Sequence, residues 1–530
     1  MTVKESAKTV PLLERSVGAL FEQACRSYPD RVAVVHGDQR VTYAELRSEV
    51  RRAGRAFLRL GLRKGDRLAI IMKDRPELLA IQYGALWAGL VVVPLNTRQG
   101  AEDNAYAAEN AGARALCHDA AHAAVAEEMR GRGTVEHFIG VDAQAVLDAG
   151  LDFAALNAAE DDGAAGLPEV APDDLMAIYY TGGTTGRPKG VAHSHRTYLA
   201  AVMSELLEMS IEGPEVFAHV APLTHASGVF VLPVLMRGGT HVILGGFDPK
   251  TLLETIERER VTATFMVPTM LYVLMDHMDT VTSDTSTLRT IIYGAAPMGR
   301  ERLVEAMERF GPILTQVYGQ TEAPNQLAVL RKEDHAEALA SGDPAVLSSC
   351  GRPVAVADVR LVDDDGNDVP AGELGEIVVR GPHVMLGYWN KPEETAQALV
   401  DGWLHTGDIA RADERGFLYI VDRKKDMIIS GGYNVYPKDV EAALFAHPAV
   451  RDVCVIGVPD AKWGEAVKAV VVADEVREEE LMAWVRERKG PLCTPKSVDL
   501  VDAIPVTALG KHDKPALRSA YWGSCERAVN

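Results

Sequence analysis

The sequence predicts an α/β fold: a large N-terminal domain of layered, mostly parallel sheets with helices plus a small β unit, and a small α+β C-terminal domain. Helical and strand-like segments alternate over residues 16–95 and again over 216–317, whereas the strands after residue 351 are short and joined by hairpin turns. Such alternation is typical of parallel sheets covered by helices, because each parallel strand pair needs a crossover connection.

Composition and charge restrict the classes of function. The length of 530 residues corresponds to roughly three or four units of about 150 residues, some of them fused. A content of 47% hydrophobic and 25% charged residues is ordinary for a globular enzyme. The formal charge of −20 repels polyanions, so we expect no nonspecific nucleic-acid binding, and any anionic ligand needs a local cationic pocket.

The six cysteines are widely scattered and form no C-x-x-C pair. Neither a zinc site nor a disulfide framework is therefore expected, and a reducing cytoplasm fits this pattern. The N-terminal residues MTVKESAKTV contain no apolar segment of a secretory signal. We accordingly predict a cytoplasmic protein that is a monomer or a homodimer.

The first alternating region predicts three helices and three strands. The helices are expected at Ser16–Ser27, Tyr43–Leu60 and Pro76–Ala88, and the strands at Val32–Val35, Arg67–Met72 and Leu90–Val93. The apolar stretch 78–95 invites a transmembrane interpretation, but Gly89 and Pro94 interrupt it. We therefore expect a helix and a buried strand there, with no integral membrane association. Residues 161–174 read as a loop.

Residues 180–190, YTGGTTGRPKG, combine glycines, threonine hydroxyls and two cations. Bare backbone N–H groups, hydroxyls and cations could converge on phosphate oxygens, although a flexible surface turn is the alternative. The strand-like run MAIYY precedes this segment and helical spacing follows it, which predicts the phosphate-binding order strand, loop, helix. The segment is not a Walker A loop, because Pro188 precedes Lys189 and Gly190 follows it.

Between residues 216 and 317 strand and helix patterns recur as a second doubly wound layer, and short strands after residue 351 form the small β unit. The charged run VDRKKD, 421–426, lies between the strand-like FLYIV and MIIS and is a candidate hinge. We predict domain boundaries at 1–424 and 425–530.

Four further segments carry chemistry-bearing side chains. YGQTEAP, 318–324, offers an aromatic face for a base, a hydroxyl for phosphate and a carboxylate that could ligate Mg²⁺. GWLHTGD ends in Asp408, whose carboxylate could accept hydrogen bonds from both ribose hydroxyls. Lys511 lies on a Thr/Gly turn before a short helix, and His225 lies in PLTHASG. Taken one at a time, each also has an ordinary structural interpretation. YGQTEAP can be a turn, Asp408 an exposed aspartate, Lys511 a solvated lysine and His225 a packed histidine.

Taken together and in this order, the motifs resemble those of the adenylate-forming superfamily, and of its acyl-CoA synthetases or AMP-dependent acid–CoA ligases in particular. The resemblance spans residues about 30–520. It implies ATP, Mg²⁺ and CoA as the cofactors, with Glu322 as the metal ligand. The catalytic residues it implies are Lys511, His225, Thr321 and Glu322.

The resemblance also implies a set of nucleotide- and CoA-binding positions. They are Thr181, Gly182, Gly183, Thr184, Thr185, Lys189, Ala295, Ala296, Gln316, Val317, Tyr318, Asp408, Arg423, Lys425, Gly431, Gly432 and Asn434. Tyr318 is expected to stack on adenine, and Arg423 to make a second ribose contact. Lys425 occupies the pivot about which a mobile C-terminal domain rotates between two half-reactions. Gly431 and Gly432 leave room for a pantetheine arm.

The implied reaction is the activation of a hydrophobic carboxylic acid to an acyl-AMP with release of pyrophosphate, followed by transfer to CoA. An alternative is an acyl-AMP ligase that loads a carrier-protein phosphopantetheine. An amino-acid adenylation domain and a noncatalytic nucleotide sensor are less favoured, since no acidic partner for an ammonium follows His225 and the residues Lys511, Glu322 and Asp408 are all present.

The chain departs from the family pattern at three positions. Gly182 stands where relatives carry serine, Thr224 replaces an aromatic residue before His225, and Ser227 is small, which suggests a widened acid pocket. Segments 225–235, 293–298 and 318–326 are expected to line that pocket. They are apolar and small without a charged determinant, so the acid itself is not predicted.

Overall fold

A computed structural model describes residues 12–522, apart from 149, 165, 182–186, 210–212, 343, 431–432, 461 and 507–511. Seven predicted site residues lie outside the described residues: Gly182, Gly183, Thr184, Thr185, Gly431, Gly432 and Lys511. The chain forms two compact units. The first comprises residues 1–182, 188–359 and 379–404, and the second comprises 183–187, 360–378 and 405–530. The predicted boundary at 424/425 falls inside the second unit and stays a prediction.

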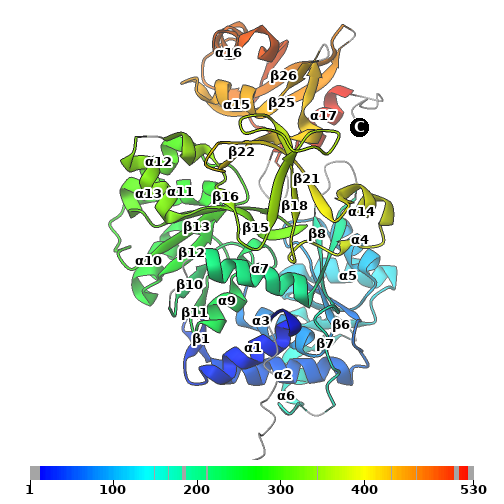
Figure 1. The fold of residues 1–530 in the computed structure, drawn as a ribbon. Helices are drawn as coiled ribbons and strands as arrows, with labels where there is room; N and C mark the ends of the chain where they lie inside the picture. The colour runs from blue at the N-terminus through cyan, green and yellow to red at the C-terminus, as the bar shows by residue number, and fades with distance from the viewer. Residues whose placement is uncertain are drawn as a thin grey trace, which may run out of the picture. The chain divides into compact units, whose positions relative to one another are not determined.

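The first unit contains a nine-stranded sheet (Figure 1). In spatial order its strands are β16 (Arg352–Pro353), β15 (Ala323–Leu330), β14 (Leu314–Gln320), β13 (Thr290–Gly294), β12 (Ala263–Met266), β10 (Val216–His219), β11 (Thr240–Ile243), β1 (Val32–His36) and β2 (Gln39–Thr42). Strands β14, β13, β12, β10, β11 and β1 run parallel, and antiparallel strands flank them.

An eight-stranded sheet forms the second layer of this unit. Its order is β19 (Gly387–Tyr388), β9 (Lys189–Ser194), β8 (Leu175–Thr181), β4 (Val91–Pro94), β3 (Arg67–Ile71), β5 (Ala113–His118), β6 (His137–Gly140) and β7 (Leu151–Asp152). Strands β8 to β7 in this order are parallel, so the predicted fold class, with its layered and mostly parallel sheets, is confirmed.

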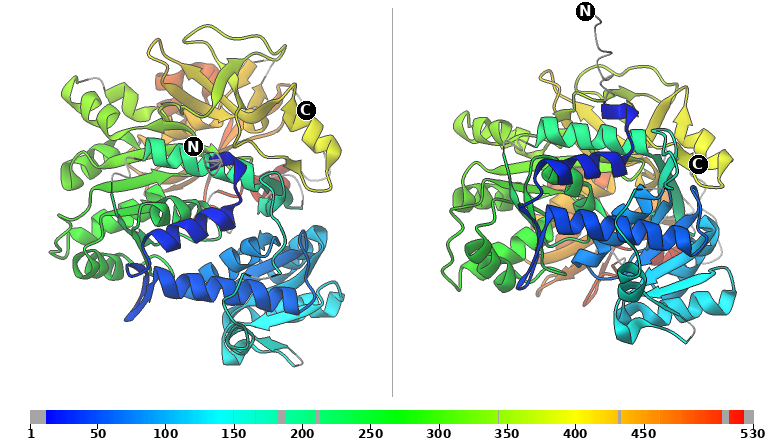
Figure 2. Two further views of the ribbon diagram at one scale, coloured as in Figure 1. Left: turned by 60° about the horizontal axis from the view of Figure 1, so that its bottom comes forward. Right: turned by 90° about the horizontal axis from the view of Figure 1, so that it is seen from below.

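The helices of the first unit are α1 (Val17–Ser27), α2 (Tyr43–Arg59), α3 (Pro76–Trp87), α4 (Ala101–Ala111), α5 (Ala123–Arg132), α6 (Phe153–Ala158), α7 (His195–Glu208), α8 (Ala226–Val229), α9 (Val231–Met236), α10 (Pro249–Glu259), α11 (Pro268–Met278), α12 (Arg300–Phe310), α13 (Lys332–Ala340) and α14 (Pro392–Ala398). Within this unit α1 and α2 lie side by side in both views of Figure 2, in blue. Among the described residues, no helix has the length and apolarity needed to cross a bilayer.

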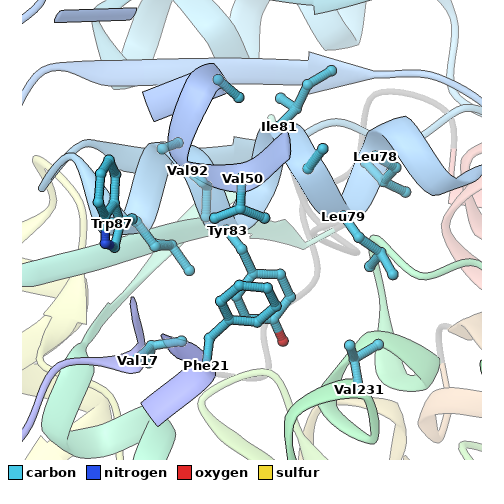
Figure 3. Close-up of a cluster of buried hydrophobic side chains, with 14 of the residues drawn as sticks. Val17, Phe21, Val50, Leu78, Leu79, Ile81, Tyr83, Trp87, Val92 and Val231 are labelled. Atoms are coloured by element: carbon cyan, nitrogen blue, oxygen red, sulfur yellow. The ribbon is translucent and has the colours of Figure 1, made fainter. Parts of the chain in front are cut away.

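One large hydrophobic cluster fills the space between α1, α2, α3, α7 and one face of the eight-stranded sheet. Figure 3 shows its centre, where the rings of Phe21 and Tyr83 stack with their centroids 4.6 Å apart. Leu68 and Ile70 of β3 belong to this cluster, whereas Ala69 and Ile71 pack on α4 and α5 on the opposite face. This alternation follows from the two-residue period of a strand that is buried on both faces.

The predicted helices and strands of residues 16–95 are confirmed within one or two residues at each end. The apolar stretch 78–95 divides, as predicted, into α3 and β4 around a turn at Gly89, whose φ of +75° suits glycine. The recurring strand and helix pattern predicted for 216–317 is confirmed, as β10, β11, α10, β12, α11, β13 and α12.

The predicted order strand, loop, helix at YTGGTTGRPKG is wrong. A second strand, β9, follows the loop and pairs antiparallel with β8, with Thr181 opposite Lys189 and Tyr180 opposite Gly190. Val191, Ala192 and His193 are buried in this strand, and α7 begins only after Ser194, whose side chain accepts a hydrogen bond from the Thr197 N–H. The segment is therefore a hairpin, and no helix N-terminus supports its phosphate-binding role.

Two small antiparallel-rich sheets complete the fold. The predicted small β unit is a sheet in the order β17 (Asp358–Val362), β18 (Gly375–Arg380), β21 (Trp403–Ala412) and β20 (Leu399–Val400), with β22 (Leu418–Arg423) paired to β21. The second unit also holds a sheet of β24 (Tyr433–Val435), β23 (Ile428–Ser430), β26 (Gly464–Ala473) and β25 (Val450–Asp460), with β27 (Ser497–Leu500) beside β26. Helices α15 (Pro437–Phe445), α16 (Glu478–Cys493) and α17 (Lys514–Trp522) complete this unit.

The first unit buries many neutral histidines, and this predicts acid lability. Burial lowers the pKa of His193, His195, His335 and His383 to about 4 and that of His241 to about 3. In the unfolded chain these imidazoles take up protons near their ordinary value of 6.5, whereas the folded protein keeps them neutral. The free energy of unfolding therefore falls as the pH drops from about 6.5 toward 4, each histidine removing up to about 1.4 kcal/mol per pH unit.

The check is the melting temperature between pH 7.5 and pH 5, measured in buffers of equal ionic strength. We expect a steep fall below pH 6, with recovery when the sample returns to pH 7.5 before heating. A melting temperature that stays level down to pH 5 would contradict this prediction.

Candidate active site

The hairpin β8–β9 places Thr181 and Lys189 on either side of the glycine-rich tip. The Thr181 hydroxyl donates to the Lys189 carbonyl at 3.5 Å, and both side chains are half-buried. Lys189 Nζ lies 4.9 Å from the centroid of the Tyr388 ring. The lysine is thus held at the loop end of the two paired strands, where it can face an anionic ligand.

The motif YGQTEAP lies on a second hairpin, formed by β14 and β15. Strand β14 includes Tyr318, Gly319 and Gln320 of the motif, so only Thr321 and Glu322 form the turn. Tyr318 is half-buried and packs on a small apolar cluster, and Val317 is buried. The Gln316 side-chain oxygen accepts a hydrogen bond from the Tyr293 hydroxyl at 3.0 Å.

The segment 385–389 ties the two hairpins together. The Met385 N–H donates to the Glu322 carbonyl at 2.8 Å, and the Trp389 N–H donates to the Gly190 carbonyl at 2.7 Å. The Tyr388 hydroxyl donates to Glu322 Oε1 at 2.8 Å. Tyr388 therefore orients the Glu322 carboxylate with its hydroxyl while its ring faces Lys189, a role that sequence reasoning missed.

A buried histidine makes a second connection between these hairpins. His193 of β9 hydrogen bonds through Nε2 to the Thr321 carbonyl oxygen at 2.8 Å and through Nδ1 to the Thr197 hydroxyl at 3.2 Å. Because the Thr321 carbonyl is an acceptor, Nε2 carries the proton and the ring is neutral. The structure thus brings Thr181, Lys189, Thr321 and Glu322 into one framework of fixed strands.

Ala295 and Ala296 follow the carboxyl end of β13, beside β14, with Gly294 opposite Val317. Ala295 has a φ of +66°, the left-handed region that alanine rarely adopts. Its side chain is exposed and that of Ala296 is half-buried. This backbone conformation costs of order 1 kcal/mol or more and turns the loop at the carboxyl end of β13, the end of a parallel sheet at which ligands bind.

His225 is the residue before α8 and is half-buried. Its Nδ1 lies 3.0 Å from the Thr224 hydroxyl, and burial, with a smaller contribution from Arg98, lowers the pKa of the imidazole. Ser227 is fully buried and its hydroxyl lies 2.8 Å from Nδ1 of His219. The widened acid pocket inferred from Thr224 and Ser227 stays a prediction.

In the second unit, Asp408 and Arg423 face each other across β21 and β22. Arg423 Nε lies 2.6 Å from Asp408 Oδ1, and the carboxylate is buried whereas the guanidinium is partly exposed. The Thr406 hydroxyl accepts from the Asp408 N–H at 3.1 Å, and Gly407 supplies a φ of +71° to the turn. The two predicted ribose-binding side chains therefore form one positioned pair.

The remaining predicted residues of the second unit are Lys425 and Asn434, both exposed. Lys425 lies in the short 3₁₀ helix Lys424–Asp426 between β22 and β23, the predicted hinge, and Asn434 lies in β24. Helix α17 follows the position of Lys511, as predicted, and is anchored by Arg518 to Asp426 at 2.8 Å and by Lys514 to Glu441 at 3.0 Å.

Replacing Asp408 with asparagine is expected to raise the KM for ATP about tenfold or more, because hydrogen bonds to a charged group contribute about 1.5–3 kcal/mol. The KM for the acid should change little. Asp401→Asn is the matched control, since Asp401 is exposed in a turn with a φ of +50° that asparagine adopts readily. Equal KM values for ATP in wild type and Asp408→Asn, from steady-state kinetics, would remove Asp408 from the nucleotide site.

Comparison with known proteins supports the family that the sequence motifs suggest. The family model described as AMP-binding enzyme matches residues 21–389, and the model of the AMP-binding enzyme C-terminal domain matches residues 439–511. The medium/long-chain-fatty-acid–CoA ligase FadD8 of Mycobacterium tuberculosis is 39% identical over 99% of this chain and 97% of its own length. Feruloyl-CoA synthase of an Amycolatopsis species is also 39% identical, over 96% of this chain and 99% of its own.

Among solved structures, the amide bond synthetase McbA from Marinactinospora thermotolerans superimposes with a TM-score of 0.84 at 35% identity. The match covers 96% of this chain and 100% of that protein. Since a family model spans most of the chain and relatives match it at nearly full length, the protein belongs to the AMP-binding enzyme family of the adenylate-forming superfamily.

Proposed function

We propose that the protein is an AMP-forming acid–CoA ligase that activates a hydrophobic carboxylic acid. One observation carries most of this proposal: Tyr388 links the carboxylate of Glu322 to the cation of Lys189 across two hairpins. A carboxylate and an ammonium that contact the same tyrosine side chain suit a magnesium–polyphosphate ligand, whose two components carry opposite charges.

In the first half-reaction an oxygen of the acid's carboxylate attacks the α-phosphorus of ATP, the bond to the bridging oxygen breaks, and pyrophosphate leaves. The chain contributes charge neutralisation and positioning rather than a nucleophile. Lys189 and the hydroxyls of Thr181, Thr184 and Thr185 bind the leaving phosphates, and Thr321 contacts the α-phosphate. Lys511 binds the carboxylate and the α-phosphate, while Tyr318 stacks on the base.

Glu322 fits a role as a magnesium ligand. Mg²⁺ is usually bound by one or two carboxylates together with substrate phosphates and water, so a single oriented carboxylate suffices. Among the residues that the structure describes, no cluster of three or more histidine, cysteine or acidic side chains could hold a metal by itself. The ion, when bound, supplies charge neutralisation of the phosphates.

In the second half-reaction the CoA thiol attacks the acyl carbon and AMP leaves with the oxygen that joined the two. We propose that the C-terminal residues 425–530 move as one mobile domain about Lys425 between these steps. Gly431 and Gly432 then admit the pantetheine arm, Asn434 approaches the acyl group, and His225 gates the acid pocket. Asp408 and Arg423 hold the ribose in both steps.

CoA is not the only acceptor of the acyl group that this proposal considers. A carrier-protein phosphopantetheine presents the same thiol as CoA, and the likeness to an amide bond synthetase makes an amine a third acceptor to include. The glycines 431 and 432 favour CoA, since they leave space for a free pantetheine arm along bare backbone.

The experiment is a pyrophosphate-release screen over fatty, aromatic and terpenoid acids, run without acceptor and then with CoA, a carrier protein or an amine. We expect acid-dependent pyrophosphate release and a CoA thioester as the product. Transfer only to the carrier protein would replace CoA as the acceptor, and no release with any acid would remove the adenylation claim.

We also propose that the protein works in the cytoplasm as a monomer or homodimer, without nucleic-acid partners. Among the described residues, cysteines 25, 117, 350, 454 and 493 form no disulfide with one another, and four of them are buried, which fits a reducing compartment.

A further inference from the structure

Helix α7 carries a buried carboxyl group that the family motifs do not include. Glu205 is fully buried, and one of its oxygens, Oε1, accepts a hydrogen bond from Asn325 Nδ2 at 2.8 Å. Its other oxygen, Oε2, is buried and has no hydrogen-bond partner among the described residues. By contrast Glu208, one turn later on the same helix, is bound by Arg331 and by the Ala355 N–H.

A second unpartnered polar atom belongs to the neighbouring strand. Gln326 of β15 is 1% exposed, and its side-chain oxygen accepts from the Ser204 hydroxyl at 2.8 Å. Its amide nitrogen Nε2 is buried and, within the described part of the chain, has no acceptor. Leaving such a group unsatisfied is unfavourable, so buried polar groups without partners call for an explanation.

The position of these groups connects them with the predicted acid site. Asn325 lies three residues after Glu322, and its Nδ2 also donates to the carbonyl of Ala226, the residue after His225, at 3.3 Å. Asn325 has a φ of +60°, so the strand is locally turned to make both contacts. Two of the segments expected to line the acid pocket therefore meet at the Glu205 carboxyl group.

The chemistry of the two free atoms indicates what they bind. Burial raises the pKa of Glu205 to about 8, so the group is protonated at neutral pH. Since Oε1 accepts from Asn325, the proton is assigned to Oε2, which has no acceptor among the described residues. Gln326 Nε2 is a donor as well. A ligand oxygen can accept a hydrogen bond from either donor, whereas a hydrocarbon can satisfy neither.

We propose that Glu205 and Gln326 form a polar subsite for the acid. They select a hydrophobic carboxylic acid that carries an oxygen substituent (hydroxyl, alkoxyl or carbonyl) remote from its carboxylate. This inference rests on the proposed function, because it assigns the substrate class of the same site. It adds two polar groups to a pocket whose predicted lining has no charged determinant: Gln326 lies within the segment 318–326, whereas Glu205 comes from α7, outside the segments that the motifs mark.

The test compares pairs of acids in acid-dependent ATP–pyrophosphate exchange. Each pair consists of the best oxygenated acid of the screen and its analogue with a methyl group in place of the oxygen substituent. We expect kcat/KM to favour the oxygenated acid by about tenfold or more, because the analogue leaves both donors unpaired. Glu205→Met and Gln326→Met should each reduce this ratio toward one by lowering kcat/KM for the oxygenated acid.

Two further variants make the result specific. Glu205→Gln keeps a neutral donor and should retain the preference, and Leu207→Met, on the exposed face of α7, is the matched control and should leave the ratio unchanged. If Glu205→Met fails to fold, the kcat/KM ratios of Gln326→Met and of the wild type test the subsite on their own. A wild-type ratio near one, as expected if a buried water alone fills the site, overturns the subsite and leaves the ligase activity standing. Absence of exchange with every acid overturns the ligase activity, and the subsite with it.

Discussion

Lys511→Ala is expected to slow acid-dependent ATP–pyrophosphate exchange by at least about 10²-fold, comparable with the loss of one preorganised oxyanion donor. The lysine is proposed to neutralise the carboxylate and the α-phosphate only while the adenylate forms. Thioester formation from supplied acyl-AMP should therefore fall much less. Measuring the two half-reactions separately on one preparation checks both expectations.

A folding defect is not expected to cause the loss of activity in Lys511→Ala. The residues after Lys511 are held by their own contacts, including Arg518 to Asp426, Lys514 to Glu441 and the Trp522 indole N–H to the Gly457 carbonyl at 2.9 Å. Truncating Lys511 removes none of these. Lys496→Ala serves as a control in the same unit. Equal losses in both half-reactions would contradict an adenylation-specific role.

Glu322→Gln is expected to reduce the same exchange by about 10² or more, because it removes the negative charge proposed to bind Mg²⁺ while keeping the shape of the side chain. The magnesium dependence should shift to higher concentrations. Exchange rates measured across a magnesium titration give both the loss of activity and the shift in magnesium dependence.

Tyr388→Phe is the matched partner of this variant. It removes only the hydroxyl that donates to Glu322 Oε1 and keeps the ring beside Lys189. A smaller loss, of about tenfold or less, is expected because one hydrogen bond to a charged group is removed and the charge itself remains. A normal magnesium profile in Glu322→Gln would exclude Glu322 as the ligand.

The alternating strands and helices could be predicted from sequence because the spacing of apolar residues follows directly from which side chains are buried. Strands β3 and β4 are apolar on both faces and α2 has one apolar stripe, so their types and ends follow from local pattern. Strand β9 was missed because Val191 to Ser194 is short and runs without a break into the helix that begins at His195. A run of four residues, Val-Ala-His-Ser, does not distinguish a strand from the first turn of a helix.

The motif residues of the site were found because their chemistry is legible in one segment. Tyr388 and Glu205 were not, because each acquires its role from a partner far along the chain, 66 residues away for Tyr388 and Glu322 and 120 for Glu205 and Asn325. The only local signal for Glu205 is an acidic residue within the largely buried α7, and Glu208 gives the same signal while it is fully paired. Long-range contacts of this kind need the folded structure.

The central claim, that the acid's own oxygen attacks the α-phosphorus of ATP, is tested most directly by isotope transfer. The enzyme is supplied with an acid labelled with ¹⁸O in both carboxylate positions, together with ATP and CoA, and the products are analysed by mass spectrometry. The mechanism predicts one ¹⁸O atom in each AMP formed and none in pyrophosphate. Unlabelled AMP, or label in a phosphate derived from the γ-position, would contradict it.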